Sequence, residues 1–151
     1  MSKPERADSI DFILANVCHL HRTRVYQLFE ALGLYHGQPP VLFELWKEEG
    51  ITQTELAGRI KITPATVTRM LQRMERSGFI RREADPSDQR ISRVFLTPIG
   101  HGIKEKVEKI WETLEQEAFS NFTNMEREEM RRMLILLRSN LLHATGEEPW
   151  K

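Results

Sequence analysis

Residues Ile51 to Leu96 read ITQTELAGRIKITPATVTRMLQRMERSGFIRREADPSDQRISRVFL, and this stretch decides the fold. Thr52 and Glu55 have the spacing of a T-x-x-E capping box, which predicts the start of a helix. Thr63 is a good N-cap and Pro64 a good first helical residue, so a second helix is expected to begin after a short turn. The stretch therefore opens with two helices joined by a tight turn.

The second helix is expected over residues 64–77, and its two faces differ in chemistry. Apolar side chains at positions i, i+3, i+4 and i+7 form one stripe, made of Val67, Met70, Leu71 and Met74. Gly78 is placed to end the helix in a left-handed conformation. Small, polar and basic side chains occupy the opposite face and its flanks: Ala65, Thr66, Thr68, Arg69, Gln72, Arg73 and Arg76. The apolar stripe is expected to face a core, and the polar side chains to face outward.

Two β-like runs follow, over residues 79–82 and 91–96, and they flank a loop. Residues 85–88 of this loop, Asp-Pro-Ser-Asp, are typical of a turn. A strand over the second run would place alternate side chains on one face, namely Ser92, Val94 and Leu96. The order of helix, turn, helix and β-hairpin predicts a winged helix-turn-helix, a shape that enters the grooves of duplex DNA.

The charge of the chain is balanced overall but unevenly distributed. The 151 residues include 22 Lys or Arg and 22 Asp or Glu, a formal net charge of zero. Residues 58–93 alone hold nine basic and four acidic side chains, a local charge of +5 that leaves −5 for the remainder. Such a basic island predicts a face that meets a phosphate backbone. A charged surface that meets only water is the alternative interpretation of the same count.

Composition and motifs argue against several classes of protein. No run approaches the roughly 18 apolar residues of a membrane span, and residues 1–11 have no signal-peptide character, so a cytoplasmic location is expected. The chain has no phosphate-binding glycine loop, no H-E-x-x-H and no G-x-S-x-G, so we expect no enzyme, no catalytic residues and no cofactor. The five histidines are scattered and predict no metal site.

Long amphipathic helices are predicted at both ends of the chain. One runs from Ser9 to Leu32, a second starts at Thr97, and the last starts at a capping box formed by Thr123 and Glu126. Their apolar stripes have no obvious partner in a small winged module, and burying apolar surface is worth about 25 cal/mol per Å². We therefore expect a homodimer that presents two recognition helices to a pseudo-palindromic site.

The predicted fold is mainly α with a small β-wing. It consists of an N-terminal dimerisation helix over 1–36, a winged helix-turn-helix DNA-binding domain over 37–97 and C-terminal dimerisation helices over 98–151. Each part follows from the caps, breaks and apolar stripes described above.

The ordered motifs resemble those of the MarR family of bacterial transcriptional regulators. TQTELA at 52–57, PATVTR at 64–69 and GFIRR at 78–82 match the family in order. DPSDQR at 85–90 followed by LTPIG at 96–100 is similar to the family's wing signature, D-x-R followed by L-T-x-x-G. The resemblance covers residues 37–100 by motif and the flanking helices by layout.

The resemblance implies a triangular homodimer that binds double-stranded DNA, as a repressor relieved by a small ligand. The implied DNA-binding residues are Ala65, Thr66, Thr68, Arg69, Gln72, Arg73, Asp88, Gln89 and Arg90. Arg90 would reach from the wing into the minor groove, where the negative potential suits a guanidinium, and Asp88 would hold it by an ion pair. Alternatively, this pair only pins the hairpin and contributes little, as exposed ion pairs do.

The family also implies an effector, a small lipophilic or phenolic compound, in a crevice beside the dimerisation helices. Candidate lining residues are His19, Arg22, Tyr26, His36 and Trp46, for which ordinary packing or surface exposure is the alternative. Cys18 suggests a redox-sensing repressor instead, like the organic-hydroperoxide repressors of the family. Those proteins carry tyrosine partners that have no clear equivalent after Cys18, and its place in a helix favours a buried, inert thiol.

A winged helix that binds another protein rather than DNA is the remaining alternative. Such a module would expose apolar side chains on the face where Arg69, Arg73 and Arg90 are expected. The basic side chains therefore favour DNA as the partner.

Overall fold

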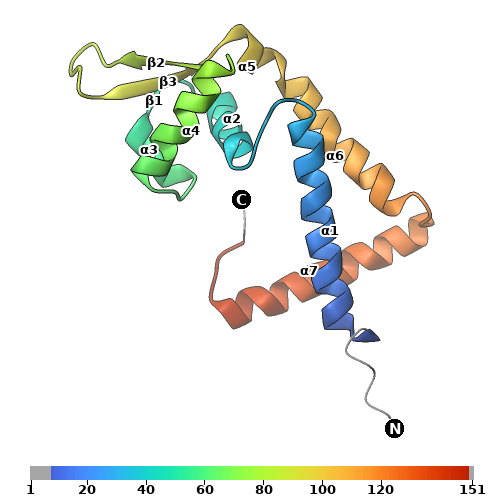
Figure 1. Ribbon diagram of the computed structural model, residues 1–151. Coiled ribbons are helices and arrows are strands. Elements are labelled where there is room, and N and C mark those ends of the chain that lie inside the picture. The colour runs from blue at the N-terminus through green and yellow to red at the C-terminus, as the bar shows by residue number, and fades with distance from the viewer. Residues whose placement is uncertain (1–7, 150–151) are drawn as a thin grey trace. The chain divides into compact units, whose positions relative to one another are not determined.

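The computed structural model describes residues 8–149, which form a mainly helical chain with one small sheet (Figure 1). The chain divides into two compact units between Glu112 and Thr113. The first unit holds α1 (Ile10–Glu30), α2 (Gln38–Lys47), β1 (Ile51–Thr52), α3 (Gln53–Arg59), α4 (Pro64–Arg76), β2 (Ile80–Ala84), β3 (Ser92–Leu96), α5 (Pro98–Gly102) and the first part of α6 (Lys104–Phe119). The second unit holds the end of α6 and α7 (Asn124–Thr145).

Side-chain caps fix the starts of five helices. The hydroxyl groups of Ser9, Thr52, Thr63, Thr97 and Thr123 each accept a hydrogen bond from the backbone N–H three residues further on. The box at Thr123 is complete, as predicted. At Thr52 the structure gives only the threonine half, because the Glu55 carboxylate accepts a hydrogen bond from Arg59 instead.

The sheet has three antiparallel strands in the order β1-β3-β2. β2 and β3 form the predicted wing, and Val94 and Leu96 share the buried face of β3. β1 is an addition that the sequence did not predict: Ile51 pairs with Val94 and Thr52 with Arg93. Ile51 is thus a buried residue of the sheet.

The core of the first unit lies beneath the apolar face of α4. Val67, Leu71 and Met74 on that face are fully buried, and Met70 lies at its edge. They belong to a core that α2, α3 and all three strands share, with the buried residues Val41, Leu42, Leu45, Ile51, Leu56, Ala57, Ile80, Val94 and Leu96. Burial of one face leaves the other face of α4 directed outward.

The predicted second long helix is interrupted. It begins at Thr97 as expected, but α5 ends at Gly102 and α6 begins only at Lys104, with Ile103 between them. Glycine has the lowest helix propensity after proline, and two glycines within α5 weaken the helix at this point.

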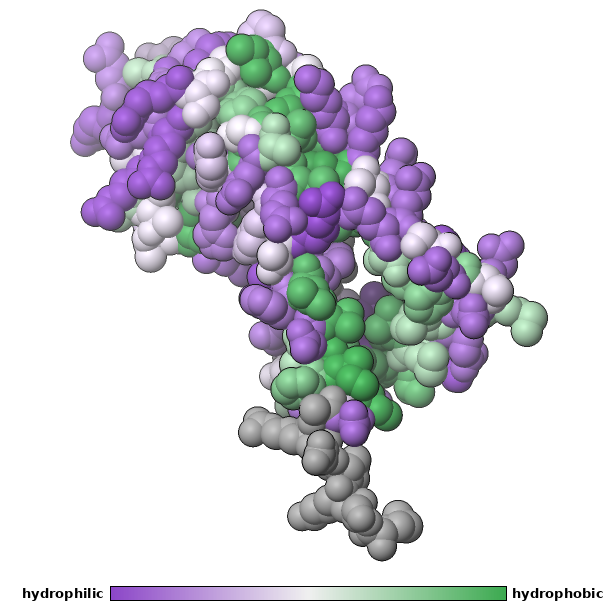
Figure 2. Space-filling view, turned by 45° about the vertical axis from the view of Figure 1, so that its right-hand side comes forward, coloured by the Kyte–Doolittle hydropathy of each residue, from purple (hydrophilic) through white to green (hydrophobic). Residues whose placement is uncertain are grey.

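Both terminal helices expose apolar side chains. On α1, a stripe of exposed residues consists of Ile10, Ile13, Val17 and Leu20, and Figure 2 shows hydrophobic surface beside the start of this helix. In the second unit, α7 buries no residue and exposes Met133, Leu134, Ile135, Leu136 and Leu141. Within the part of the chain that the structure describes, none of the helices is both long and apolar enough for a membrane span.

Candidate nucleic-acid interface

The outer face of α4 carries the polar side chains that the sequence singled out. Ala65, Thr66, Arg69, Gln72 and Arg73 are exposed, whereas Thr68 is half-buried. Thr63 caps the helix, and Pro64 occupies its first position. The outer face is therefore accessible to a large partner along several turns of the helix.

The threonine hydroxyl groups of α4 are already hydrogen-bonded within the protein. Thr66 Oγ1 lies 2.8 Å from Thr63 Oγ1. Thr68 Oγ1 accepts a hydrogen bond from Gln53 Nε2 at 2.5 Å and donates one to the Pro64 carbonyl at 2.9 Å. The role of Gln53, which connects α3 to α4, was missed from the sequence because the bond joins residues of two different helices. Arg69, Gln72 and Arg73 remain as the groups best able to read base edges.

Ion pairing divides the basic island into two sets. Five of its nine cations face carboxylates: Arg59, Arg81, Arg82, Arg90 and Arg93. The other four have no ion pair within residues 8–149, and they are Lys61, Arg69, Arg73 and Arg76. All four lie on α4 or in the turn before it. The positive charge that no carboxylate neutralises within residues 8–149 is thus concentrated on α4 and in the turn before it, rather than spread over the whole island.

The base of the wing is fastened by a second aspartate–arginine pair. Arg93 Nε lies 2.5 Å from Asp85 Oδ2, and the same guanidinium donates to the Gly50 carbonyl at 2.7 Å. Asp85 Oδ1 accepts from the backbone N–H groups of Ser87 and Asp88. The hydrogen bond from Arg93 is the main cause that lowers the pKa of Asp85. This arrangement joins the start of the wing loop to Gly50, the residue before β1, and it was not predicted from the sequence.

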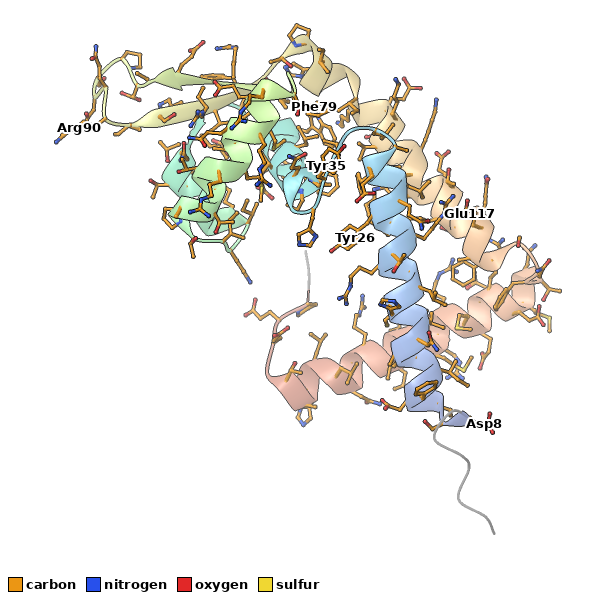
Figure 3. The ribbon with its side chains drawn as sticks, viewed as in Figure 1. Asp8, Tyr26, Tyr35, Phe79, Arg90 and Glu117 are labelled. Atoms are coloured by element: carbon orange, nitrogen blue, oxygen red, sulfur yellow. The ribbon has the colours of Figure 1, made fainter. Side chains whose placement is uncertain are left out.

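At the tip of the wing, Asp88 and Arg90 form the predicted ion pair. Nε and Nη2 of Arg90 each lie 3.0 Å from one oxygen of Asp88, so the pair is bidentate. The hydrogen bond from Arg90 is the main cause that lowers the pKa of Asp88. The Arg90 side chain is 91% exposed, and Figure 3 shows it projecting from the end of the hairpin. Gln89 beside it is also exposed.

Replacement of Arg90 with alanine is expected to weaken DNA binding by tenfold or more, as loss of a charge-assisted contact of about 1.5–3 kcal/mol requires. The thermal midpoint should not change, because the side chain is almost fully exposed. Gel-shift titration and thermal unfolding measure the two effects. Arg132→Ala is the matched control, because Arg132 forms a similar bidentate pair with Glu129 on α7. Equal affinity of the two variants would mean that Arg90 only pins the hairpin.

The five candidate effector residues are not gathered around one cavity among the described residues. The rings of Tyr26 and His36 are 5.0 Å apart. Trp46 Nε1 instead donates to the Gly100 carbonyl at 3.0 Å, and its ring packs against Phe43. His19 and Arg22 are exposed on α1. A cavity of about 240 Å³ beside Trp46 is otherwise lined by Leu45, Lys47, Glu48, Glu49, His101 and Lys104.

Cys18 corrects one expectation. Its thiol is exposed in the described chain rather than buried. The helix stripe that suggested burial is itself exposed, because its neighbours Val17 and Leu20 face outward from α1 without covering.

Comparisons with known proteins agree on one family. Residues 34–92 match the model of the MarR family. The chain is 33% identical to the HTH-type transcriptional regulator TtmR of Methylorubrum extorquens, over 93% of this chain and 71% of that protein. It is 30% identical to the uncharacterized HTH-type transcriptional regulator YybA of Bacillus subtilis, over 75% of each.

Solved structures show the same likeness in three dimensions. A MepR variant of S. aureus bound to an oligodeoxyribonucleotide has a TM-score of 0.70 and 27% identity, and the match covers 88% of this chain and 98% of that one. A crystal structure of MarR has a TM-score of 0.67 and 31% identity, with 97% and 100% covered. With its exposed basic recognition helix and its wing, the chain belongs to the MarR family of DNA-binding winged-helix transcriptional regulators.

Proposed function

We propose that this regulator binds a pseudo-palindromic DNA operator as a homodimer and represses transcription until a small ligand releases it. The observation that carries the proposal is the outer face of α4, where Arg69 and Arg73 are exposed without ion pairs within residues 8–149. Because neither side chain forms an ion pair within these residues, no such ion pair has to break when the side chain contacts a base or a phosphate. Gln72 adds an exposed amide on the same face.

The uncovered terminal helices support the homodimer. The exposed stripe on α1 and the exposed apolar residues of α7 lie in regions 1–36 and 98–151, which we assign to dimerisation, with 37–97 as the DNA-binding domain. Leaving such stripes in water costs about 25 cal/mol per Å² of apolar area. A two-fold symmetric dimer covers them with the same surface of a second copy and sets two copies of α4 about one helical turn of DNA apart.

Relief by a ligand is the part of the proposal that concerns regulation. Repression itself is supported by similarity to a protein named HTH-type transcriptional repressor MT2955 of Mycobacterium tuberculosis, at 25% identity over 87% of this chain. His19, Arg22, Tyr26, His36 and Trp46 are the residues we assign to a lipophilic or phenolic effector. A panel of phenolic acids added to the protein–DNA complex tests this assignment, and release of DNA that Tyr26→Ala abolishes is the expected result.

Selection of duplexes from a random pool by the purified protein tests operator binding directly. We expect enrichment of an inverted repeat whose half-sites are about one helical turn apart. Placed upstream of a reporter, the enriched sequence should lower expression when the protein is present. Failure to enrich any inverted repeat would favour a winged helix that binds another protein.

Replacement of Arg69 with alanine is expected to lower operator affinity by about 1–3 kcal/mol, the range for one bidentate contact between arginine and guanine. Arg69→Lys is the informative control, because lysine keeps the charge but not the planar fork of donors. We expect Arg69→Lys to retain binding to unrelated duplex DNA and to lose preference for the operator. If both variants keep the preference of the native protein in gel-shift titrations, Arg69 reads no base.

A further inference from the structure

The turn between α3 and α4 contains a backbone conformation that its residue does not favour. Lys61 has a φ of 55°, and among residues 8–149 it is the one non-glycine residue with a positive φ. The other five residues in this region of backbone space are all glycines. A side chain in the left-handed region brings Cβ too close to the following carbonyl oxygen, which glycine avoids.

The local hydrogen bonds show why the conformation is needed. Ile62 N–H donates to the Ala57 carbonyl at 3.1 Å and Lys61 N–H to the Gly58 carbonyl at 3.4 Å, the two bonds of a Schellman motif. The same two bonds end α4, where Gly78 is the left-handed residue. They also end α1, where that residue is Gly33. Three helices thus end in the same way, and α3 alone among these three places a lysine where the others have glycine.

No contact among the residues that the structure describes accounts for the lysine. Lys61 is exposed, and within residues 8–149 its ammonium forms neither an ion pair nor a side-chain hydrogen bond. It precedes Thr63, the cap of α4, by two residues, so its charge lies beside the positive end of the recognition-helix dipole. The positive charge of Lys61 and the positive end of the helix dipole repel each other in the free protein, and together they attract an anion.

We propose that Lys61 is a phosphate-binding residue, whose ammonium contacts the DNA backbone beside the major groove that α4 enters. The proposal rests on the DNA-binding function proposed above and adds a residue to it. A lysine suits this task because a compact charge on a flexible stem contacts a phosphate without a fixed orientation. Residues held in unfavourable backbone conformations concentrate at functional sites, where function rather than stability keeps them.

Lys61→Gly separates the two consequences of this residue, since glycine relieves the backbone and removes the charge. We expect the thermal midpoint of the variant to rise by about 2–4 °C, because the backbone strain that glycine relieves exceeds the entropy that it adds to the unfolded chain. We expect its affinity for DNA to fall. We also expect the slope of log affinity against log salt to decrease in magnitude, by about 0.9 for each lysine that contacts a phosphate. A mixed-sequence duplex of about 30 base pairs is a suitable probe, because it spans two half-sites one helical turn apart.

Two further variants complete the experiment. Lys61→Arg keeps the charge and should keep the salt slope. Lys106→Ala removes another exposed lysine, on α6 outside the assigned DNA-binding domain, and should leave the salt slope unchanged. A lower thermal midpoint for Lys61→Gly would overturn the claim that the lysine is strained. Unchanged salt dependence for Lys61→Gly, while the native protein binds the duplex, would overturn the phosphate contact alone. If the native protein shows no salt-dependent binding, the proposed function itself fails.

Discussion

Replacement of Gly100 with alanine is expected to lower the free energy of unfolding by about 3 kcal/mol or more, the upper range for overpacking. A Cβ at this position would meet the Phe79 carbonyl oxygen far inside contact distance, and it would lie 3.0 Å from Cδ2 of Leu96. The Phe79 oxygen belongs to the backbone and also accepts a hydrogen bond from Thr97 N–H, so no rotation of a side chain relieves the clash. The start of β2 and the end of β3 would have to move apart from α5.

Gly102→Ala is the matched control, two residues away in the same short helix. A Cβ at Gly102 meets no heavy atom within 4 Å, so the alanine adds helix propensity without a clash. It should raise the free energy of unfolding by about 0.5–1 kcal/mol. Urea unfolding of both variants measures these opposite effects. A Gly100→Ala variant as stable as the native protein would show that α5 does not approach Phe79 this closely.

Replacement of Val17 with aspartate is expected to dissociate the proposed homodimer and to reduce operator affinity by more than about 100-fold, because an unpaired charge inside an interface costs several kcal/mol. Val17 is 55% exposed in the single chain, so the substitution should leave the fold of the chain intact. It lies in the middle of the exposed stripe on α1, which a second copy covers in the proposed dimer. Sedimentation equilibrium measures the mass, and gel-shift titration measures the affinity.

Ala15→Asp introduces the same charge on the opposite side of α1. Ala15 is exposed and lies two positions from Val17, about 200° around the helix. We expect this variant to remain dimeric and to bind the operator. Dissociation by both substitutions would mean that any charge on α1 disturbs the dimer, and dissociation by neither would place the interface elsewhere.

The features that sequence predicted well are local ones. Thr63 and Thr123 were identified as caps because a cap joins a hydroxyl to a backbone N–H only three residues away. β1 was missed because its two residues have no pattern of their own and become a strand only by pairing with distant β3. Gly100 appeared in the wing signature, but the reason that only glycine fits, the nearby Phe79 carbonyl, depends on the fold.

The same distinction divides the candidate site. Arg69 and Arg90 were predicted from the order of motifs, and the structure places both side chains at the surface. Charge counting treated all nine cations of the island alike, whereas the structure neutralises Arg59 with Glu44, Glu48 and Glu55, two of which lie outside α3. Lys61 could not be singled out, because its positive φ follows from the hydrogen bonds that end α3 and not from its residue type.

The pairing of β1 with β3 also bears on how the protein folds. β1 precedes the helix-turn-helix and β3 follows it, so Ile51 opposite Val94 closes a loop of about 40 residues around α3 and α4. The entropy of closing that loop is lost before these strand contacts form, so we expect the β1–β3 pairing to form after the local helices and the β2–β3 hairpin. While β1 and β3 are paired, both ends of the segment that holds α3 and α4 are held in the sheet. We therefore expect α4 to open together with the β1–β3 pairing rather than by fraying from a terminus.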